Sequence, residues 1–352
     1  MTGPREPDEV TGEETEHLAA LLHAVEDAEE LLVVTHDNPD PDALASAAAL
    51  GFLLQHCEGL RTTLAFGGIV GRAENQALIR ELGVDFERLG GENGINPGTI
   101  VALVDTQPRA GNNSLPAGRI ANVVIDHHPR RPETEASPFA DVRPEYGANC
   151  SILVKYLRAA ELEPDRRLAT GLFYGIQTET ADLGREASRA DISASLYLYP
   201  RIDPEAYSRI LHPPLPKGYF RSVHQALEEA RRYGHVIIAP AGKLVYPDMV
   251  AELADLLIRA RGTEWAVAAG TFGGQLLISV RSSKPVAHAG DLVRGVIGDR
   301  GSAGGHGMLA GGQIPLHGLS EEEVERVSAS VLEDFLEALG ASGEHSESLT
   351  QL

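Results

Sequence analysis

Residues 35–46 read Thr-His-Asp-Asn-Pro-Asp-Pro-Asp-Ala-Leu-Ala-Ser and include three side chains that can bind a cation: His36, Asp40 and Asp42. The stretch follows an apolar run at residues 31–34 and precedes a segment rich in alanine and leucine. It therefore lies where a buried strand meets a helix N-terminus, which is where ligands bind in open α/β sheets. Carboxylates crowded into such a crevice repel one another and lose solvation, so this cluster predicts a bound cation.

Two later apolar runs end in residues of the same kinds. Residues 100–104 read Ile-Val-Ala-Leu-Val and are followed by Asp105, and residues 123–125 are followed by Asp126, His127 and His128. Runs that are apolar on both faces are typical of buried parallel strands. Because such strands end at one edge of a sheet, we expect these side chains to lie close to the first cluster.

The full set of candidate ligands combines imidazoles and carboxylates with no thiolate. This chemistry favours a hard or borderline divalent ion, with Mn²⁺ ahead of Mg²⁺ and with Zn²⁺ or Co²⁺ as alternatives. Six ligands are too many for one ion that must leave room for substrate. We therefore expect two ions about 3.5 to 4 Å apart, as in sites for in-line phosphoryl transfer. The six are His36, Asp40, Asp42, Asp105, His127 and an acid from either Glu179 or Asp182.

The elements that must position these residues predict two α/β domains. The N-terminal domain is expected to have a mostly parallel sheet with helices on both faces. The smaller C-terminal domain is expected to have a mixed sheet, because residues 265–270 and 275–281 read as a hairpin. The predicted parts are a disordered leader at 1–12, a catalytic domain at 13–190, a helical connector at 191–234, a substrate-binding domain at 235–340 and a flexible tail at 341–352.

The formal charge of the 352-residue chain is -21. Such a surface repels long polyanions, because nonspecific nucleic-acid affinity comes from Lys and Arg that neutralise phosphates. Any phosphate substrate is therefore expected to be short. No apolar run has the length of a membrane span and the acidic N-terminus is unlike a signal peptide, so we expect a cytoplasmic protein with no membrane partner. Cys57 and Cys150 lie in apolar helical segments and are expected to be reduced.

The order of the motifs resembles the DHH phosphoesterase superfamily. The motifs are His36-x-x-x-Asp40-x-Asp42, Val104-Asp105, Asp126-His127-His128, Thr178-Glu179-Thr180 and Gly304-Gly305-His306. The likeness covers residues 30–315 and is closest to the two-domain branch of oligoribonucleases (nanoRNases) and 3'-phosphoadenosine 5'-phosphate phosphatases. Five motifs in order are a far more specific signal than one Asp-His-His.

The resemblance implies roles for the residues of the first domain. One ion would be bound by His36, Asp40 and Asp105. The other would be bound by Asp42, Asp105, His127 and the acid of the fourth motif, with Asp105 shared between the ions. The implied catalytic residues are Asp105, His128, which would contact phosphate or assist proton transfer, and Asp126, which would orient the histidine pair.

The resemblance also implies a phosphate-binding role for the second domain. Arg281 and His306 would bind the substrate phosphate, while Gly304 and Gly305 in a glycine loop would let backbone N–H groups approach it. Arg185, beyond the fourth motif, is a weaker candidate for the same role. An arginine in solvent beside a helix, with no part in binding, explains its position equally well.

The fourth motif departs from the family pattern. The family carries Thr-Asp-Thr, whereas this chain has Thr178-Glu179-Thr180, with Asp182 two residues further on. By register we expect Glu179 to be the ligand, with Asp182 as the alternative. The change predicts a weaker or altered second metal site.

The expected activity is that of a metal-dependent phosphodiesterase or phosphatase. A hydroxide activated by two metal ions would hydrolyse short oligonucleotides, linear dinucleotides or 3'-phosphoadenosine 5'-phosphate. The expected partner is thus a short oligonucleotide or nucleotide and not a long nucleic acid. The resemblance is also compatible with a homodimer. Two alternatives stay open: an inorganic pyrophosphatase or other small phosphatase that uses the same site, and a nucleotide-binding regulator whose turnover is reduced by Glu179.

Overall fold

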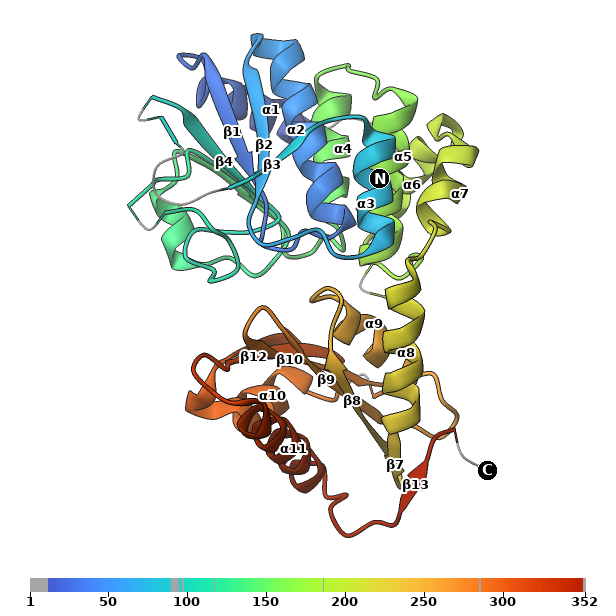
Figure 1. The fold of residues 1–352 in the computed structure, drawn as a ribbon. Helices are drawn as coiled ribbons and strands as arrows, with labels where there is room; N and C mark the ends of the chain where they lie inside the picture. Colours follow the sequence, from blue (N-terminus) through green and yellow to red (C-terminus); the bar gives the residue numbers. More distant parts are fainter. Residues whose placement is uncertain are drawn as a thin grey trace, which may run out of the picture. The chain divides into compact units, whose positions relative to one another are not determined.

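The computed structural model describes residues 12–89, 95–96, 98–116, 118–185, 187–284 and 286–350. The chain folds as two compact units, Met1–Pro213 and Pro214–Leu352, and Figure 1 labels most of their helices and strands. Most of the expected leader, residues 1–11, lies outside the described residues. No helix in the described part of the chain is long and apolar enough to cross a membrane.

Among the described residues, the first unit contains a six-stranded parallel sheet with the order β3-β2-β1-β4-β5-β6. The strands are β1 (Glu30–Val34), β2 (Arg61–Phe66), β3 (Phe86–Arg88), β4 (Ile100–Val104), β5 (Val123–Asp126) and β6 (Phe139–Val142). The parallel sheet expected from the apolar runs is confirmed. From β1 the chain adds strands toward one edge of the sheet, and from β4 it adds them toward the other edge. Ligands of open α/β sheets bind at the carboxyl ends of the two strands where this direction changes, which here are β1 and β4.

The helices of the first unit contribute to one large core on one face of this sheet. They are α1 (Gly12–His23), α2 (Pro41–Glu58), α3 (Ala73–Leu82), α4 (Asn149–Ala159), α5 (Arg166–Glu179), α6 (Arg189–Leu198) and α7 (Pro204–Leu211). On the opposite face, the cluster around Leu32 and Leu103 is completed by loop residues such as Leu115 and Ala121 and by no residue of a described α-helix. Helices were expected on both faces. A strand that is apolar on both faces predicts burial, but it does not distinguish a helix from an apolar loop as the cover.

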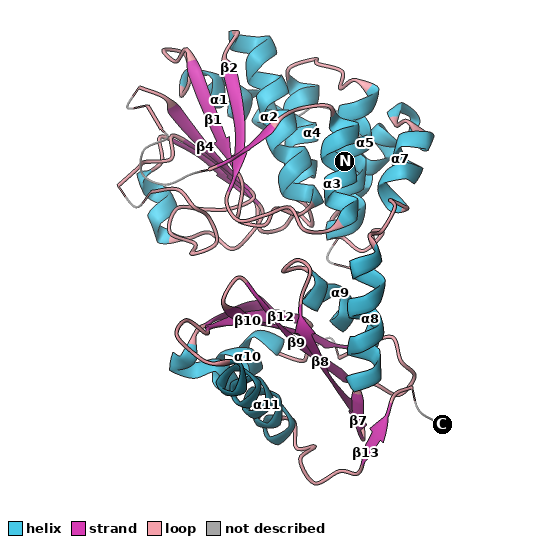
Figure 2. Cartoon of the chain, in the orientation of Figure 1, coloured by secondary structure: helices cyan, strands magenta, loops and turns pink. Residues whose placement is uncertain are grey.

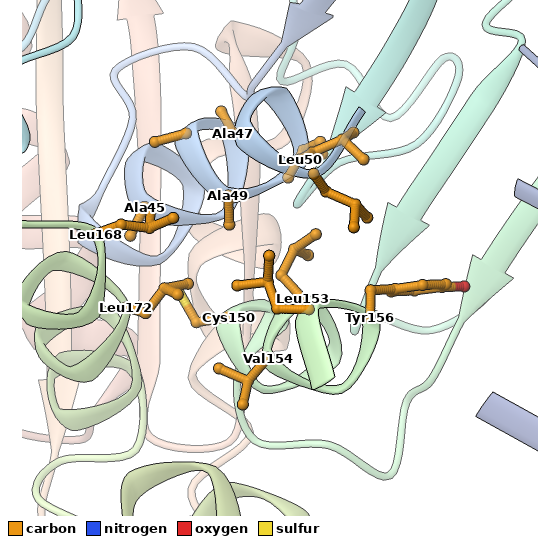
Figure 3. Close-up of a cluster of buried hydrophobic side chains, with 14 of the residues drawn as sticks. Ala45, Ala47, Ala49, Leu50, Cys150, Leu153, Val154, Tyr156, Leu168 and Leu172 are labelled. Carbon is orange, nitrogen blue, oxygen red and sulfur yellow. The ribbon is translucent and has the colours of Figure 1, made fainter. Parts of the chain in front are cut away.

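Helices α2, α4 and α5 pack closely, as Figure 3 shows for the side chains that meet between them. The approach of α5 requires a glycine, because a Cβ atom on Gly175 would lie 2.6 Å from Cys150 Sγ and 3.2 Å from Asp42 Cα. The end of α5, with Glu179, is thereby fixed relative to the start of α2, with Asp42. The two cysteines, Cys57 and Cys150, are free thiols, as expected.

The described part of the second unit contains a seven-stranded mixed sheet with the order β11-β12-β10-β9-β8-β7-β13 (Figure 2). Its strands are β7 (Arg231–Tyr233), β8 (Val236–Lys243), β9 (Trp265–Phe272), β10 (Gln275–Ser282), β11 (Ser302–His306), β12 (Leu309–Pro315) and β13 (Ser346–Ser348). Its helices are α8 (Lys217–Glu229), α9 (Met249–Leu257), α10 (Ala289–Ile297) and α11 (Glu321–Ala338). The mixed sheet and the β9–β10 hairpin, which turns at Gly273 and Gly274 with positive φ, are as expected.

Two segments of the second unit differ from expectation. The predicted glycine loop is strand β11, which pairs antiparallel with β12, so the loop prediction is wrong. Helix α10 packs closely on this strand and requires a glycine there, because a Cβ atom on Gly290 of α10 would lie 2.1 Å from the carbonyl oxygen of Gly305. Residues 341–352 were expected to be a flexible tail, whereas residues 346–348 form β13 and pair with β7.

Candidate metal centre

The turn after β1 presents His36 and Asp40 toward each other. Asp40 is the N-cap of α2, and its Oδ1 accepts a hydrogen bond of 3.0 Å from the backbone N–H of Ala43. Pro41 follows at the first helical position, where a proline fits because no backbone N–H is needed there. The other oxygen of Asp40, Oδ2, is left facing His36 Nε2 at 3.6 Å.

Asp105 lies at the centre of the cluster, immediately after β4. Its Oδ2 is 3.5 Å from His36 Nε2, and its Oδ1 is 3.3 Å from His127 Nε2 and 3.7 Å from His128 Nδ1. The residue is 2% exposed and has a φ of 58°, in the left-handed region that non-glycine residues rarely adopt. Such strain persists where the surrounding structure imposes it, and it is frequent at functional sites.

Hydrogen bonds at Nδ1 fix the orientation of all three histidine rings. The Nδ1 atom of His36 donates to the carbonyl oxygen of Asp37 at 3.0 Å, and that of His127 donates to the carbonyl oxygen of Tyr146 at 3.2 Å. Both rings therefore turn Nε2 toward Asp105, in the arrangement typical of histidines that bind metals. His128 instead donates from Nδ1 to Asp126 Oδ1 at 2.9 Å and is nearly half exposed, which leaves its Nε2 for solvent or substrate.

Asp42 lies beside this cluster but is hydrogen-bonded to the start of α4. Its carboxylate accepts bonds of 2.6 Å from the N–H of Asn149 and 2.7 Å from the N–H of Cys150. Its Oδ2 is 3.9 Å from His127 Nε2, and the side chain is fully buried. Each carboxylate oxygen has a second lone pair, so these two bonds leave Asp42 able to bind a cation.

Glu179 and Asp182 differ in what surrounds them. The negative charges of Asp40, Asp42 and Asp105 all raise the pKa of Glu179, at the end of α5. Asp182 is exposed, and its negative charge helps to raise the pKa of Tyr207 of α7. The predicted phosphate ligand Arg185 donates to the carbonyl oxygen of Glu179 at 3.0 Å and so closes the C-terminus of α5.

The protonation of the cluster shows how strongly its charges interact. Burial and the charge of Asp105 raise the pKa of Asp42 to about 7, and burial and the charge of Asp40 raise the pKa of Glu179 to about 8. Burial lowers the pKa of His127, but its interaction with Asp105 and the charges of the other nearby carboxylates raise it to about 11. His127 and His36 hold the pKa of Asp105 well below its ordinary value, although burial by itself would raise it. Without a metal ion, protons thus supply the positive charge that the cluster needs.

The residues present fit divalent metal ions. Single ligand atoms of His36, Asp40 and Asp105 lie within 4.8 Å of one another, and those of Asp105, His127 and His128 do so as well. Among the described residues, Asp105 Oδ1 and His127 Nε2 are buried and have no hydrogen-bond partner. Buried polar atoms are rarely left unpaired without a reason such as a missing ion or a catalytic role. A cation between these two atoms would pair both.

Gln107 is a site residue that the sequence analysis did not identify. It is buried, and its Nε2 donates to Asp126 Oδ2 at 2.6 Å and to the carbonyl oxygen of Pro129 at 3.1 Å. Its Oε1 accepts from the N–H of Arg131 and from Thr134 Oγ1, both at 2.8 Å. Gln107 therefore fixes Asp126, which in turn orients His128. Its only sequence signal is its position two residues after Asp105.

The residues predicted to bind phosphate in the second unit lie in its sheet. Arg281, in β10, is hydrogen-bonded to Asp255 of α9 and, at 2.8 Å, to Ser279 Oγ. Gly304, Gly305 and His306 lie in β11, and the side chain of His306 is outside what the structure describes. Lys284, near Arg281, forms an ion pair of 2.6 Å with Glu264.

Two protein families match the chain along most of its length. Residues 30–176 match the DHH family, N-terminal domain, and residues 234–339 match the DHHA1 domain. The first match contains the Asp105 cluster and ends within α5, three residues before Glu179. The second contains Arg281 and β11.

Similar proteins were found in an archaeon and in two bacteria. The uncharacterized protein MJ1633 of Methanocaldococcus jannaschii is 33% identical over 322 residues, which are 89% of this chain and 65% of the relative's length. An exopolyphosphatase-related protein from Bacteroides fragilis has a TM-score of 0.64 at 15% identity, covers 92% of this chain and is itself covered to 98%, which shows a shared fold. RecJ from Thermus thermophilus, solved with Mn²⁺, has a TM-score of 0.45 at 14% identity, with 96% of this chain and 56% of RecJ covered.

Proposed function

Because the chain belongs to the DHH superfamily, we propose that the cluster around Asp105 is the active site of a metal-dependent phosphoesterase. The observation that carries the proposal is the position of Asp105 between three imidazoles, with its Oδ1 and His127 Nε2 buried and unpaired among the described residues. Few arrangements other than a metal site make such a set of buried ligands favourable.

The proposed ligands divide into two sets that share Asp105. His36 and Asp40 complete one set, while Asp42, His127 and Glu179 complete the other. The ions, with Mn²⁺ favoured, would polarise the phosphoryl oxygens and lower the pKa of a water molecule. We prefer Glu179 to Asp182 as the metal ligand because the negative charges of Asp40, Asp42 and Asp105 raise the pKa of Glu179.

His128 is the group of this chain that supports proton transfer. Burial lowers its pKa, but hydrogen bonding to Asp126 and the charge of Asp105 raise it to about 9. In the metal-free protein the ring is therefore a cation at neutral pH, with its Nε2 proton directed away from Asp126. It can donate that proton to a phosphoryl oxygen or to the leaving oxygen, while Gln107 and Asp126 fix the ring.

The proposed substrates are short oligonucleotides, linear dinucleotides and 3'-phosphoadenosine 5'-phosphate. The formal charge of -21 disfavours long nucleic acids, because each added phosphate is repelled. We propose that Arg281 of the second unit binds a substrate phosphate, together with Gly304, Gly305 and His306. The hydrogen bonds of Arg281 to Asp255 and Ser279 order its guanidinium group before substrate binds.

The test is hydrolysis by the purified full chain after removal of metal and addition of Mn²⁺. The substrates are a linear diguanylate, a five-nucleotide RNA, 3'-phosphoadenosine 5'-phosphate, pyrophosphate and a long single-stranded RNA, and Asp105→Asn is the inactive control. We expect Mn²⁺-dependent release of mononucleotide or phosphate from one of the first three and little reaction with the long RNA.

Other outcomes would contradict the proposal. Cleavage of pyrophosphate alone would assign a pyrophosphatase. Binding of a nucleotide with Mn²⁺ present and no product would assign a regulator, and recovery of turnover in Glu179→Asp would then identify the changed fourth motif as the cause.

A further inference from the structure

Residues 146–150 contact two of the proposed ligands of one ion through their backbone. The carbonyl oxygen of Tyr146 accepts from His127 Nδ1, and the N–H groups of Asn149 and Cys150 donate to the two oxygens of Asp42. The position of this segment therefore sets the positions of both side chains. His36 and Asp40 do not depend on it, since they are fixed by Asp37 and by the start of α2.

The middle of the segment is bonded to a buried carboxylate from a different element. Asp191, in the first turn of α6, accepts from the N–H of Gly147 at 2.8 Å and from the N–H of Ala148 at 3.2 Å. It also accepts from the N–H and the hydroxyl of Ser188, both at 2.7 Å. Its side chain is 0% exposed, so four donors satisfy a carboxylate that water does not reach. The residue was expected to begin the connector after the catalytic domain, whereas it lies within the first unit.

The first residue of the segment has a separate attachment. The hydroxyl of Tyr146 accepts from Arg143 Nη1 at 3.2 Å, and the cationic groups of Arg143 and Lys155 each lie 5.4 Å from the centre of its ring. Loss of Asp191 would therefore free the part of the segment that bonds to Asp42 more than the part that bonds to His127.

We propose that Asp191 is a positioning residue for the ion bound by Asp42 and His127. The inference rests on the proposed function and names a group that acts on the metal through the backbone of residues 147–150. Hydrogen bonds to an ionised acceptor are stronger than neutral ones, and unpaired buried N–H groups are costly. The carboxylate thus keeps Gly147 and Ala148 in place, and the two following N–H groups remain directed at Asp42.

The variant that tests this is Asp191→Asn in the full chain. The amide keeps the volume of the side chain but offers one acceptor oxygen in place of two. In either orientation its NH₂ group faces the N–H of Gly147 or of Ala148, so at least one of these bonds is lost. The matched control is Asp203→Asn, which makes the same chemical change at the N-cap of α7, where Asp203 accepts from Glu205 and Ala206 and bonds to no part of residues 146–150.

Two measurements are made on the wild type and both variants well below their melting temperatures. One is Mn²⁺ binding by calorimetry, which gives the number of ions and the affinity of each. The other is amide hydrogen exchange in the metal-free protein. For Asp191→Asn we expect the affinity for one of two ions to fall about 10- to 100-fold, the range found for groups that orient metal ligands. We also expect faster exchange at Asn149 and Cys150, and Asp203→Asn to change neither quantity.

The possible failures can be told apart. A wild type that binds two Mn²⁺ ions, with Asp191→Asn binding both equally well, overturns the role of Asp191 and leaves the proposed function standing. Equal changes in Asp203→Asn also overturn it, since the effect would then be a general loss of stability. A wild type that binds no Mn²⁺ overturns the metal centre and the role of Asp191 together.

Discussion

Asp105 Oδ1 and His127 Nε2 face each other at 3.3 Å, both are buried, and neither has a hydrogen-bond partner among the described residues. The two atoms come from the ends of adjacent parallel strands, β4 and β5, whose register pairs Val104 with Ile125. The geometry of the sheet thus brings the acid and the imidazole together, and the other ring nitrogen of His127, Nδ1, bonds to the carbonyl oxygen of Tyr146. A cation bound by both atoms would pair them.

Asp105→Asn should abolish binding of at least one ion. The amide has nearly the shape of the carboxylate but no charge, and its NH₂ group would repel a cation. We expect Mn²⁺-dependent hydrolysis to fall by more than the roughly 10- to 100-fold that groups behind the ligands contribute. Calorimetric titration with Mn²⁺ checks the cause, and a variant that binds metal as the wild type does would refute the central role of Asp105.

Gln107→Ala should lower both stability and turnover. The change removes the hydrogen-bond partner of Asp126 Oδ2, of the N–H of Arg131 and of the hydroxyl of Thr134, and we expect the free energy of unfolding to fall by about 1 to 3 kcal/mol. Since Asp126 is then fixed only through Oδ1, we also expect kcat to fall roughly 10- to 100-fold. Urea unfolding and steady-state kinetics measure the two effects. Gln76→Ala is the control, because the side chain of Gln76 donates to the carbonyl oxygens of Val70 and Gly71 and to none of the proposed ligands, and it should change stability by less than about 0.5 kcal/mol.

Glu179→Gln and Asp182→Asn should have different effects on the metal. Each change removes one negative charge, but only Glu179 interacts with Asp40, Asp42 and Asp105. We expect Glu179→Gln to weaken binding of one Mn²⁺ ion by about tenfold or more, and Asp182→Asn to leave both affinities within about twofold of the wild type. Calorimetry on the two variants decides between the residues, and the reverse pattern would assign the ligand to Asp182.

The stabilisation of the protein by Mn²⁺ should increase with pH. The pKa values of Asp42 and Glu179, raised to about 7 and about 8, mean that these groups contribute stability below their ordinary values of 3.8 and 4.5, and that this contribution is lost as the pH rises toward the raised values. The metal-free protein therefore loses this stabilisation progressively from about pH 4 to pH 8, with the last part lost between pH 6 and pH 8, while a cation can replace the lost protons. We expect the rise in Tm on adding Mn²⁺ to be larger at pH 8 than at pH 6, as measured by calorimetric melting with and without chelator. An equal or smaller rise at pH 8 would show that metal does not replace these protons.

The apolar runs were sufficient to predict the parallel sheet and the convergence of the motifs. Strands β1, β4 and β5 contain the apolar runs 31–34, 100–104 and 123–125 because both of their faces are buried, and each run is followed by residues of the Asp105 cluster. Parallel strands end at one edge, so the approach of His36, Asp105 and His127 follows from local patterns alone. The pattern of glycines was less informative, since an edge strand packed under a helix and a loop both tolerate Gly304 and Gly305.

The sequence by itself determined which residues reach the centre, because strand period, helix capping and proline placement are local properties. Only the tertiary structure decided what fixes those residues. The bonds of Gln107 to Asp126, of Asn149 and Cys150 to Asp42, and of Asp191 to Gly147 and Ala148 join positions 19 to 108 residues apart. Four of these five bonds involve backbone N–H groups, which every residue except proline carries, so no residue type in the sequence marks the partner. The folding of distant segments against one another selects it.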